Sequence, residues 1–168
     1  VGVVPGEYGQ MIAHLLRAGF SYERDELKES LEEIRAAQKF EAKGARRDLV
    51  FCRMINGAAV FAASGEKDNL ELLTAKLEAY INRNKCYYLT PNLEAFKTRI
   101  SMLDADQEVA AGWLEQYYTV DLKQPELYKC YRDFTTVRAY LVMNEIDKAR
   151  EGIAKLRRMG EEFHRLLD

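Results

Sequence analysis

The sequence is poor in the residues that cross-link a small domain or bind a metal. Its 168 residues include three cysteines and two histidines. Cys52, Cys86 and Cys130 form no Cys-x-x-Cys pair, which is typical of reduced thiols. A chain of this length buries about 70% of the surface that its unfolded form exposes, so its core needs neither a disulfide nor a metal. We therefore expect no structural metal and no cofactor.

An excess of positive charge and long apolar runs are also absent. The formal net charge is -2. The longest run without a charged residue extends from Met54 to Gly65, which is much shorter than a bilayer-spanning helix of about 20 residues. Binding to nucleic acid by counterion release needs a clustered positive excess. We expect a cytoplasmic protein that contacts neither nucleic acid nor a membrane through this chain.

Neither end of the sequence has the features of a natural terminus. The chain starts at Val1 without a methionine, and the apolar pattern around Phe163 and Leu166 still runs when the sequence stops at Asp168. No glycine or proline stop signal follows that pattern. We expect the chain to be a fragment of a larger protein.

Proline is scarce, and its distribution favours helices. Three prolines occur in the chain, and none lies between Gly6 and Thr90. Apolar residues instead recur every three or four positions, as at Leu27, Leu31 and Ile34. The same spacing recurs within residues 70–80, 93–103 and 146–163. The sequence therefore predicts an all-α fold.

Four breaks divide the helical pattern at similar intervals. They fall at Gly19, Gly65, Ala105 and Asn144, with separations of 46, 40 and 39 residues. Glycine and asparagine tolerate the left-handed conformation that often ends a helix. The interval is close to the period of helical-hairpin solenoids. We predict one domain over residues 1–168, built from four stacked antiparallel hairpins at about 5–42, 45–85, 91–120 and 125–163.

The second half of the chain resembles a known family. In the segment from Arg138 to Ala149, a tyrosine, a turn residue, an aliphatic residue and an alanine fall at the offsets of a tetratricopeptide repeat. With the segments 89–95 and 103–114 and with Arg99, it is similar to the tetratricopeptide-like sensor region of MalT-type, LuxR-family transcriptional regulators. The resemblance is strongest over residues 87–168. Leu70 departs from the repeat pattern, which has a small alanine at that place.

This resemblance implies a right-handed superhelix that serves as effector sensor and oligomerisation surface in a large cytoplasmic regulator. Such a regulator also has an upstream nucleotide-binding ATPase module and a downstream helix-turn-helix. Neither module lies in this sequence, which lacks the phosphate-binding G-x-x-x-x-G-K-[ST] loop.

Residues that carry catalysis or bind metal form no recognised pattern. The two histidines, His14 and His164, are far apart, and the single E-x-x-H motif ending at His164 is one half of what a di-iron site needs. Ser64 does not lie in a G-x-S-x-G elbow. We therefore predict no catalytic residues, no metal site and no enzymatic activity.

Two arginines mark a candidate binding groove. Arg99 and Arg138 each lie six residues before a break, at Ala105 and Asn144. In tetratricopeptide folds this place faces the concave groove, which would receive a carboxylate or phosphate. The same register adds Tyr131, Phe134 and Leu141 beside Arg138, and Ala95 and Met102 beside Arg99. In an alternative interpretation, each arginine pairs with a neighbouring acid such as Asp133 or Glu94.

Two functions remain open at this point. The first is a non-catalytic effector-sensing and oligomerisation module of a MalT-like regulator, which binds a small molecule or a protein partner and self-associates. The second is a free-standing tetratricopeptide adaptor that holds a peptide or helix of a partner protein.

Overall fold

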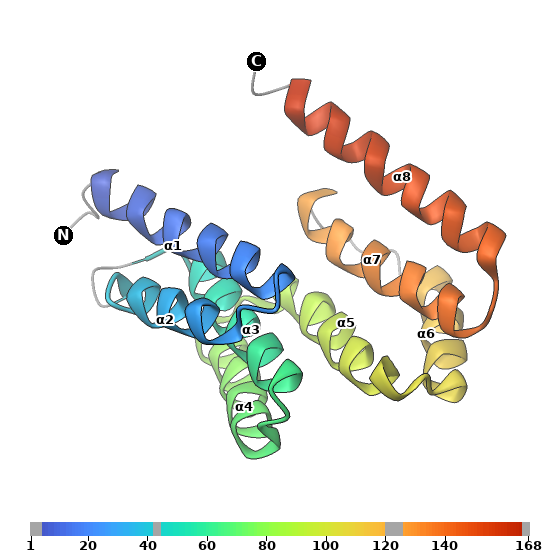
Figure 1. The fold of residues 1–168 in the computed structure, drawn as a ribbon, viewed down its shortest axis with the longest axis horizontal. Helices are drawn as coiled ribbons and strands as arrows, with labels where there is room; N and C mark the ends of the chain where they lie inside the picture. The colour runs from blue at the N-terminus through green and yellow to red at the C-terminus, as the bar shows by residue number, and fades with distance from the viewer. Residues whose placement is uncertain (1–4, 42–44, 120–125, 166–168) are drawn as a thin grey trace. The chain divides into compact units, whose positions relative to one another are not determined.

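The computed structural model describes residues 5–41, 45–119 and 126–165, and this part of the chain is helical without a strand. The all-α prediction is confirmed. In chain order the helices are α1 (Pro5–Glu23), α2 (Leu27–Gln38), α3 (Arg47–Ala63), α4 (Lys67–Asn84), α5 (Thr90–Ser101), α6 (Gln107–Thr119), α7 (Glu126–Val142) and α8 (Ile146–Arg165) (Figure 1). Two 3-10 turns, η2 (Tyr87–Leu89) and η3 (Met102–Asp104), flank α5.

The chain divides into two compact units, Val1–Thr90 and Pro91–Asp168. Each unit holds two consecutive helix pairs, α1–α2 and α3–α4 in the first unit and α5–α6 and α7–α8 in the second. The four ranges predicted for hairpins contain these pairs, apart from one residue at the start of α5 and two at the end of α8. A continuous right-handed superhelix across both units stays a prediction.

The turn inside each pair contains one residue with a left-handed backbone. These residues are Asp25, Gly65, Ala105 and Asn144, with φ angles of 62°, 73°, 55° and 59°. After three of them, all except Ala105, the N–H of the next residue donates to the carbonyl five residues earlier, at 2.9, 2.9 and 2.8 Å in chain order. This 6→1 bond, with the bond from the left-handed residue itself, is the Schellman ending of a helix. The prediction of left-handed turn residues at Gly65 and Asn144 is confirmed.

The predicted break at Gly19 is wrong, because α1 continues past it to Glu23 and the turn falls at Asp25. Ala18 is buried on α1, and the Ser30 hydroxyl of α2 donates to its carbonyl oxygen at 2.8 Å, so the helix is held against α2 at this point. Aspartate also adopts the left-handed conformation more readily than most residues. With Asp25 as the turn residue, the repeat interval becomes 40, 40 and 39 residues.

Small buried residues let the paired helices approach closely. Ser30, Ala110 and Ala149 lie five residues after their turns, and all three are almost completely buried. In α4 this place is occupied by the larger Leu70. In the second pair, the small residue that lets the two helices approach is instead Gly57 of α3. A Cβ added to Gly57 of α3 would lie 3.1 Å from a methyl carbon of Leu73. The second pair therefore packs closely despite the departure at Leu70.

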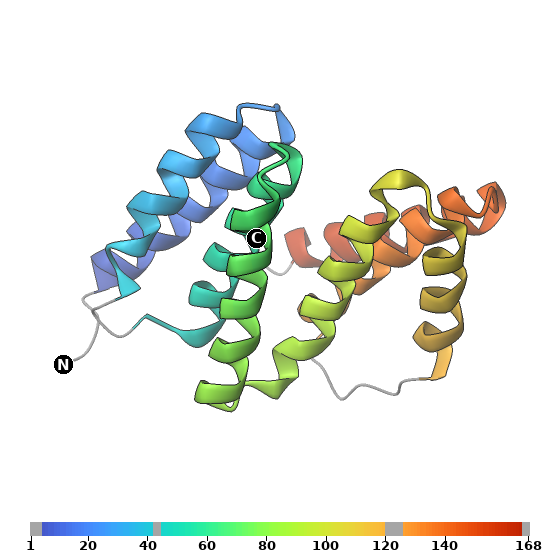
Figure 2. The ribbon, with the colours of Figure 1, turned by 90° about the horizontal axis from the view of Figure 1, so that it is seen from below.

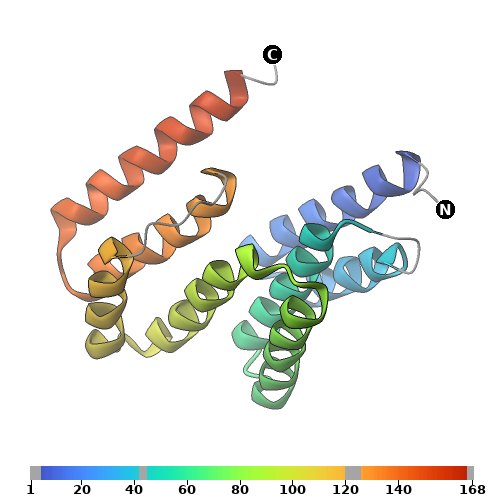
Figure 3. The same cartoon turned by 180° about the vertical axis from the view of Figure 1, so that it is seen from behind.

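The third pair is more open than the others. Helices α5 and α6 diverge from their turn (Figure 2), whereas α7 and α8 lie antiparallel and side by side (Figure 3). One buried cluster combines residues of α5, η3, α6 and α7: Ala95, Met102, Ala110, Trp113 and Ala139. The indole Nε1 of Trp113 donates to the hydroxyl oxygen of Thr136 at 3.0 Å. Helix α7 thus packs against both helices of the third pair.

Candidate interaction surface on the last helix pair

Within each unit, the first helix of one pair packs against the first helix of the next pair. In the first unit, Leu15 of α1 packs in a cluster with Leu49 of α3, and Tyr22 packs in a cluster with Val60. In the second unit, Ala95 and Met102 pack with α7. The contact therefore repeats in the same register in both units.

We define the front face of a first helix by the positions 10, 6 and 3 residues before its left-handed turn residue. These positions are Leu15, Gly19 and Tyr22 in α1, Ala95, Arg99 and Met102 in α5 with η3, and Phe134, Arg138 and Leu141 in α7. The back face is defined by the positions 13, 9 and 5 residues before that residue. In α7 these are Tyr131, Thr135 and Ala139, and the Thr135 hydroxyl donates to the Ala95 carbonyl oxygen at 3.3 Å.

The second helix of each pair adds one position to the front face, nine residues after the turn residue. This position holds Ile34 in α2, Leu114 in α6 and Ile153 in α8. Ile34 is buried with Val60 of α3, and Leu114 packs against clusters that include residues of α7. The next pair thus covers this position in the first and third pairs.

The front face of the last pair is uncovered. Phe134 is 54% exposed, Leu141 49% and Ile153 51%, and Arg138 between them is exposed as well. At the equivalent places in the third pair, Ala95 and Met102 are buried, at 0% and 5% exposed. Phe134, Arg138, Leu141 and Ile153 are thus exposed at positions that the next helix pair covers in the third pair, and we call these four residues the front surface.

The residues predicted for a groove divide between this surface and the core. Phe134, Arg138 and Leu141 lie on the front surface. Met102 and Ala95 do not line an open groove, because α7 covers the face of α5 that carries them. Tyr131, which the sequence pattern placed beside Arg138, lies instead on the back face of α7, against Arg99 of α5. The spacing of residues in the sequence could not show which helix covers which face.

The two arginines occupy equivalent positions with different surroundings. Arg99 is half-buried, and its guanidinium carbon lies 5.0 Å from the centre of the Tyr131 ring on the back face of α7. Arg138 is exposed, and neither arginine forms an ion pair within the described residues. The acids named as alternative partners contact lysines, Glu94 with Lys97 at 3.3 Å and Asp133 with Lys155 at 2.9 Å.

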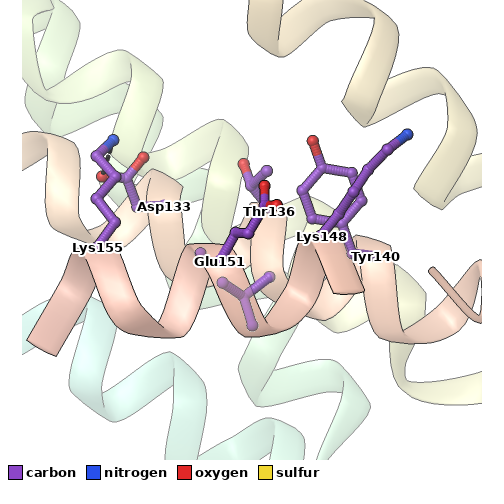
Figure 4. Close-up of a pocket in the computed structure, with 8 residues that line it drawn as sticks. Asp133, Thr136, Tyr140, Lys148, Glu151 and Lys155 are labelled. Atoms are coloured by element: carbon purple, nitrogen blue, oxygen red, sulfur yellow. Dashed lines mark ion pairs between the residues drawn. The ribbon is translucent and has the colours of Figure 1, made fainter. Parts of the chain in front are cut away.

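A pocket of about 390 Å³ lies between α7 and α8 (Figure 4), and sequence reasoning missed it. Asp133 and Lys155 lie at one end, and Tyr140 and Lys148 at the other. The Lys148 ammonium lies 5.6 Å from the centre of the Tyr140 ring and 2.5 Å from a Glu145 carboxylate oxygen. The lining is therefore polar and carries charges of both signs.

A similar hollow, of about 430 Å³, occurs between α1 and α2, lined in part by Arg17, Ser21, Glu29 and Glu32. These residues stand at the same distances from Asp25 as Thr136, Tyr140, Lys148 and Glu151 do from Asn144. The hollow thus recurs with the helix pair, while the side chains that line it change.

Metal-binding clusters and membrane-spanning helices are both absent from the described residues. No group of three or more histidine, cysteine, aspartate or glutamate side chains there is arranged to hold a metal ion. No helix in that part of the chain has the length and apolar character to cross a membrane.

Comparison with known proteins returns no match to a protein-family model, to a curated protein or to a solved structure.

Proposed function

We propose that this chain is a non-catalytic interaction module whose front surface binds an α-helix of a protein partner. One observation carries the proposal. Phe134, Arg138, Leu141 and Ile153 are exposed, while the equivalent side chains of the preceding pair are covered by a packed helix. A surface with the register of a helix-packing contact and no helix on it is suited to receive one.

The packing of α7 on α5 in the second unit indicates which side chains a partner helix would carry. Tyr131 covers Arg99, and the small residue Ala139 lies in the buried cluster beside Met102. A helix on the front surface would place apolar side chains against Phe134 and Leu141. An aromatic ring or a carboxylate on that helix would suit the Arg138 guanidinium.

The experiment selects helical peptides from a displayed library against the full chain. Peptides that bind the parent should lose binding to Phe134→Glu and to Arg138→Glu, because both changes alter the front surface. Binding should persist with Leu72→Glu, which alters an equally exposed leucine on α4. Selected peptides that bind all three variants equally would contradict the proposal.

The wider context of the module follows from the family resemblance. We propose that the chain belongs to a cytoplasmic MalT-like regulator, in which the front surface transmits an effector signal or joins protomers. The free-standing adaptor is the alternative. The complete reading frame distinguishes them, since the regulator requires an ATPase module upstream and a helix-turn-helix downstream.

Effector binding has its own candidate site, the polar pocket between α7 and α8. Binding to the folded state raises thermal stability, so a metabolite screen by thermal shift detects it. A metabolite bound in the pocket should stabilise the parent and lose this effect in Glu151→Ala, because Glu151 lines the pocket. Equal stabilisation of both proteins would place the effector elsewhere.

A further inference from the structure

We propose that the pocket between α7 and α8 binds a small organic cation that carries a primary ammonium group. The carboxylates of Asp133 and Glu151 would hold the ammonium group, and Val137 and Tyr140 would contact the apolar part of the molecule. This inference rests on the proposed function, which assigns the pocket to an effector, and it names the chemical class of that effector.

The pocket does not owe its opening to the ends of the sequence. It lies in the last pair, and the preceding pair α5–α6 packs against α7 without filling it. The equivalent hollow lies in the first pair, and it stays open although α3 packs against α1 and α2. Neither a preceding pair nor a following pair therefore covers this side of a helix pair.

Asp133 places a buried carboxylate at one end of the pocket (Figure 4). Its side chain is 7% exposed, whereas that of Lys155, whose ammonium nitrogen lies 2.9 Å from a carboxylate oxygen of Asp133, is 52% exposed. Burying a carboxylate is costly unless cations or other hydrogen-bond donors surround it. A carboxylate offers about four acceptor sites, so Asp133 can accept from a ligand ammonium group as well as from the half-exposed lysine.

The charges at the pocket favour a cation over an anion. The two lysines that line it, Lys148 and Lys155, already contact the carboxylates of Glu145 and Asp133, at 2.5 and 2.9 Å. Glu151 also lines the pocket, and it forms no hydrogen bond or ion pair within the described part of the chain. The pocket therefore has one carboxylate more than its lysines neutralise.

The middle of the pocket supplies an apolar contact for the rest of the molecule. Val137 and Tyr140 are 8% and 7% exposed, and Gly152 beside Val137 carries no side chain. The Lys148 ammonium lies 5.6 Å from the centre of the Tyr140 ring, so this ring already has a cation near it. The pocket volume of about 390 Å³ is within the usual range for small-molecule sites.

Three probes of similar shape and different charge test this inference by nuclear magnetic resonance on the full, isotope-labelled chain: benzylamine, benzyl alcohol and benzoate. Benzylamine should shift the amide resonance of Gly152 in a saturable way. The amide of Gly160, which lies on the same helix outside the pocket, should not respond. Benzyl alcohol and benzoate should bind at least about ten-fold more weakly, because neither offers a cation to Asp133 and Glu151.

Variants of the two carboxylates identify the binding groups. Glu151→Gln should weaken benzylamine binding about three-fold, as expected for an exposed ion pair. Glu162→Gln makes the same change of charge on α8 outside the pocket and should leave the affinity unchanged. Asp133→Asn should weaken binding about ten-fold, with circular dichroism as the check on native helix content. If Asp133→Asn does not fold, the comparison of Glu151→Gln with Glu162→Gln decides.

The inference is wrong if the amide of Gly152 does not respond to benzylamine, if benzyl alcohol or benzoate binds as tightly, or if Glu151→Gln and Glu162→Gln bind benzylamine equally. Peptide binding to the front surface does not use the pocket, so it separates these failures from that of the interaction module. An anionic or neutral metabolite that stabilises the parent but not Glu151→Ala would overturn the cation and leave the effector site in place.

Discussion

The guanidinium carbon of Arg99 lies 5.0 Å from the centre of the Tyr131 ring, and this contact joins α5 to the back face of α7. Arg138 stands 39 residues later in the same register and is exposed on the front surface. The two arginines therefore occupy the same position of the repeat in different surroundings. Arg99 is covered by the next first helix, and Arg138 is exposed to solvent.

Replacing these arginines by methionine should separate the two states. Arg99→Met removes the cation above the Tyr131 ring and should lower the free energy of unfolding by about 0.5–1 kcal/mol. Arg138→Met should change it by less than about 0.5 kcal/mol, because an exposed arginine loses no packed partner. Denaturant unfolding measures both values at a protein concentration where the chain is monomeric. Equal losses would show that Tyr131 does not stabilise Arg99.

The close packing of α7 on α8 depends on Gly152. A Cβ at this position would lie 2.6 Å from Cγ2 of Val137, and the nearest atom belongs to a branched side chain with little room to move. We expect Gly152→Ala to cost about 1–3 kcal/mol of stability through overpacking. Thermal and denaturant unfolding of the full chain measure this cost.

Gly160 on the same helix is the matched control. Nothing lies within 4 Å of a Cβ added there, so Gly160→Ala should stabilise the chain by about 0.5–1 kcal/mol through its better helix propensity. A stabilising Gly152→Ala would show that α7 and α8 lie further apart than in this structure.

The thiol of Cys52 should react slowly although part of its side chain reaches solvent. Cys52 is an exposed residue of α3, yet desolvation by the surrounding protein and, secondarily, the negative charge of Asp48 raise the pKa of Cys52 to about 11. The thiolate is the reacting form. We expect iodoacetamide at pH 8 to modify Cys52 on the order of 100-fold more slowly in the folded chain than in urea, as measured by peptide mass mapping.

The raised pKa of Cys52 also makes the stability of the folded chain depend on pH. The folded chain binds the Cys52 proton more tightly than the unfolded chain, so this contribution to stability is complete below pH 9 and is lost as the pH rises from 9 towards 11. Asp48→Asn should lower the pKa and speed alkylation. Equal alkylation rates in the folded and unfolded chain at pH 8 would contradict the shift.

Much of the fold could be predicted because its signals are local. Apolar residues at every third or fourth position define the helices, and the turns at Gly65 and Asn144 use residues that accept a left-handed backbone. The turn at Asp25 was missed because Gly19 offered a stronger signal inside the same apolar stretch. Gly19 instead continues α1, since tertiary contacts at Ala18 hold the helix there.

The candidate surface could be predicted only in part. The register of Arg99 and Arg138 follows from the repeat interval, and it leads directly to Phe134 and Leu141. Which of these positions is covered depends on the packing of α7 on α5, and no spacing in the sequence shows it. Ile153 was missed for the same reason, because its equivalence with Leu114 becomes visible only across two packed pairs.

The most direct test of the open front surface compares Met102→Glu with Leu141→Glu. The two residues occupy the same register position and are similar in size, but Met102 is 5% exposed and Leu141 49%. Denaturant unfolding of the monomeric chain should give a loss of about 3 kcal/mol or more for Met102→Glu, because a carboxylate is buried, and of less than about 1 kcal/mol for Leu141→Glu. Equal losses would show that Leu141 is covered as Met102 is, and the front surface would not be open.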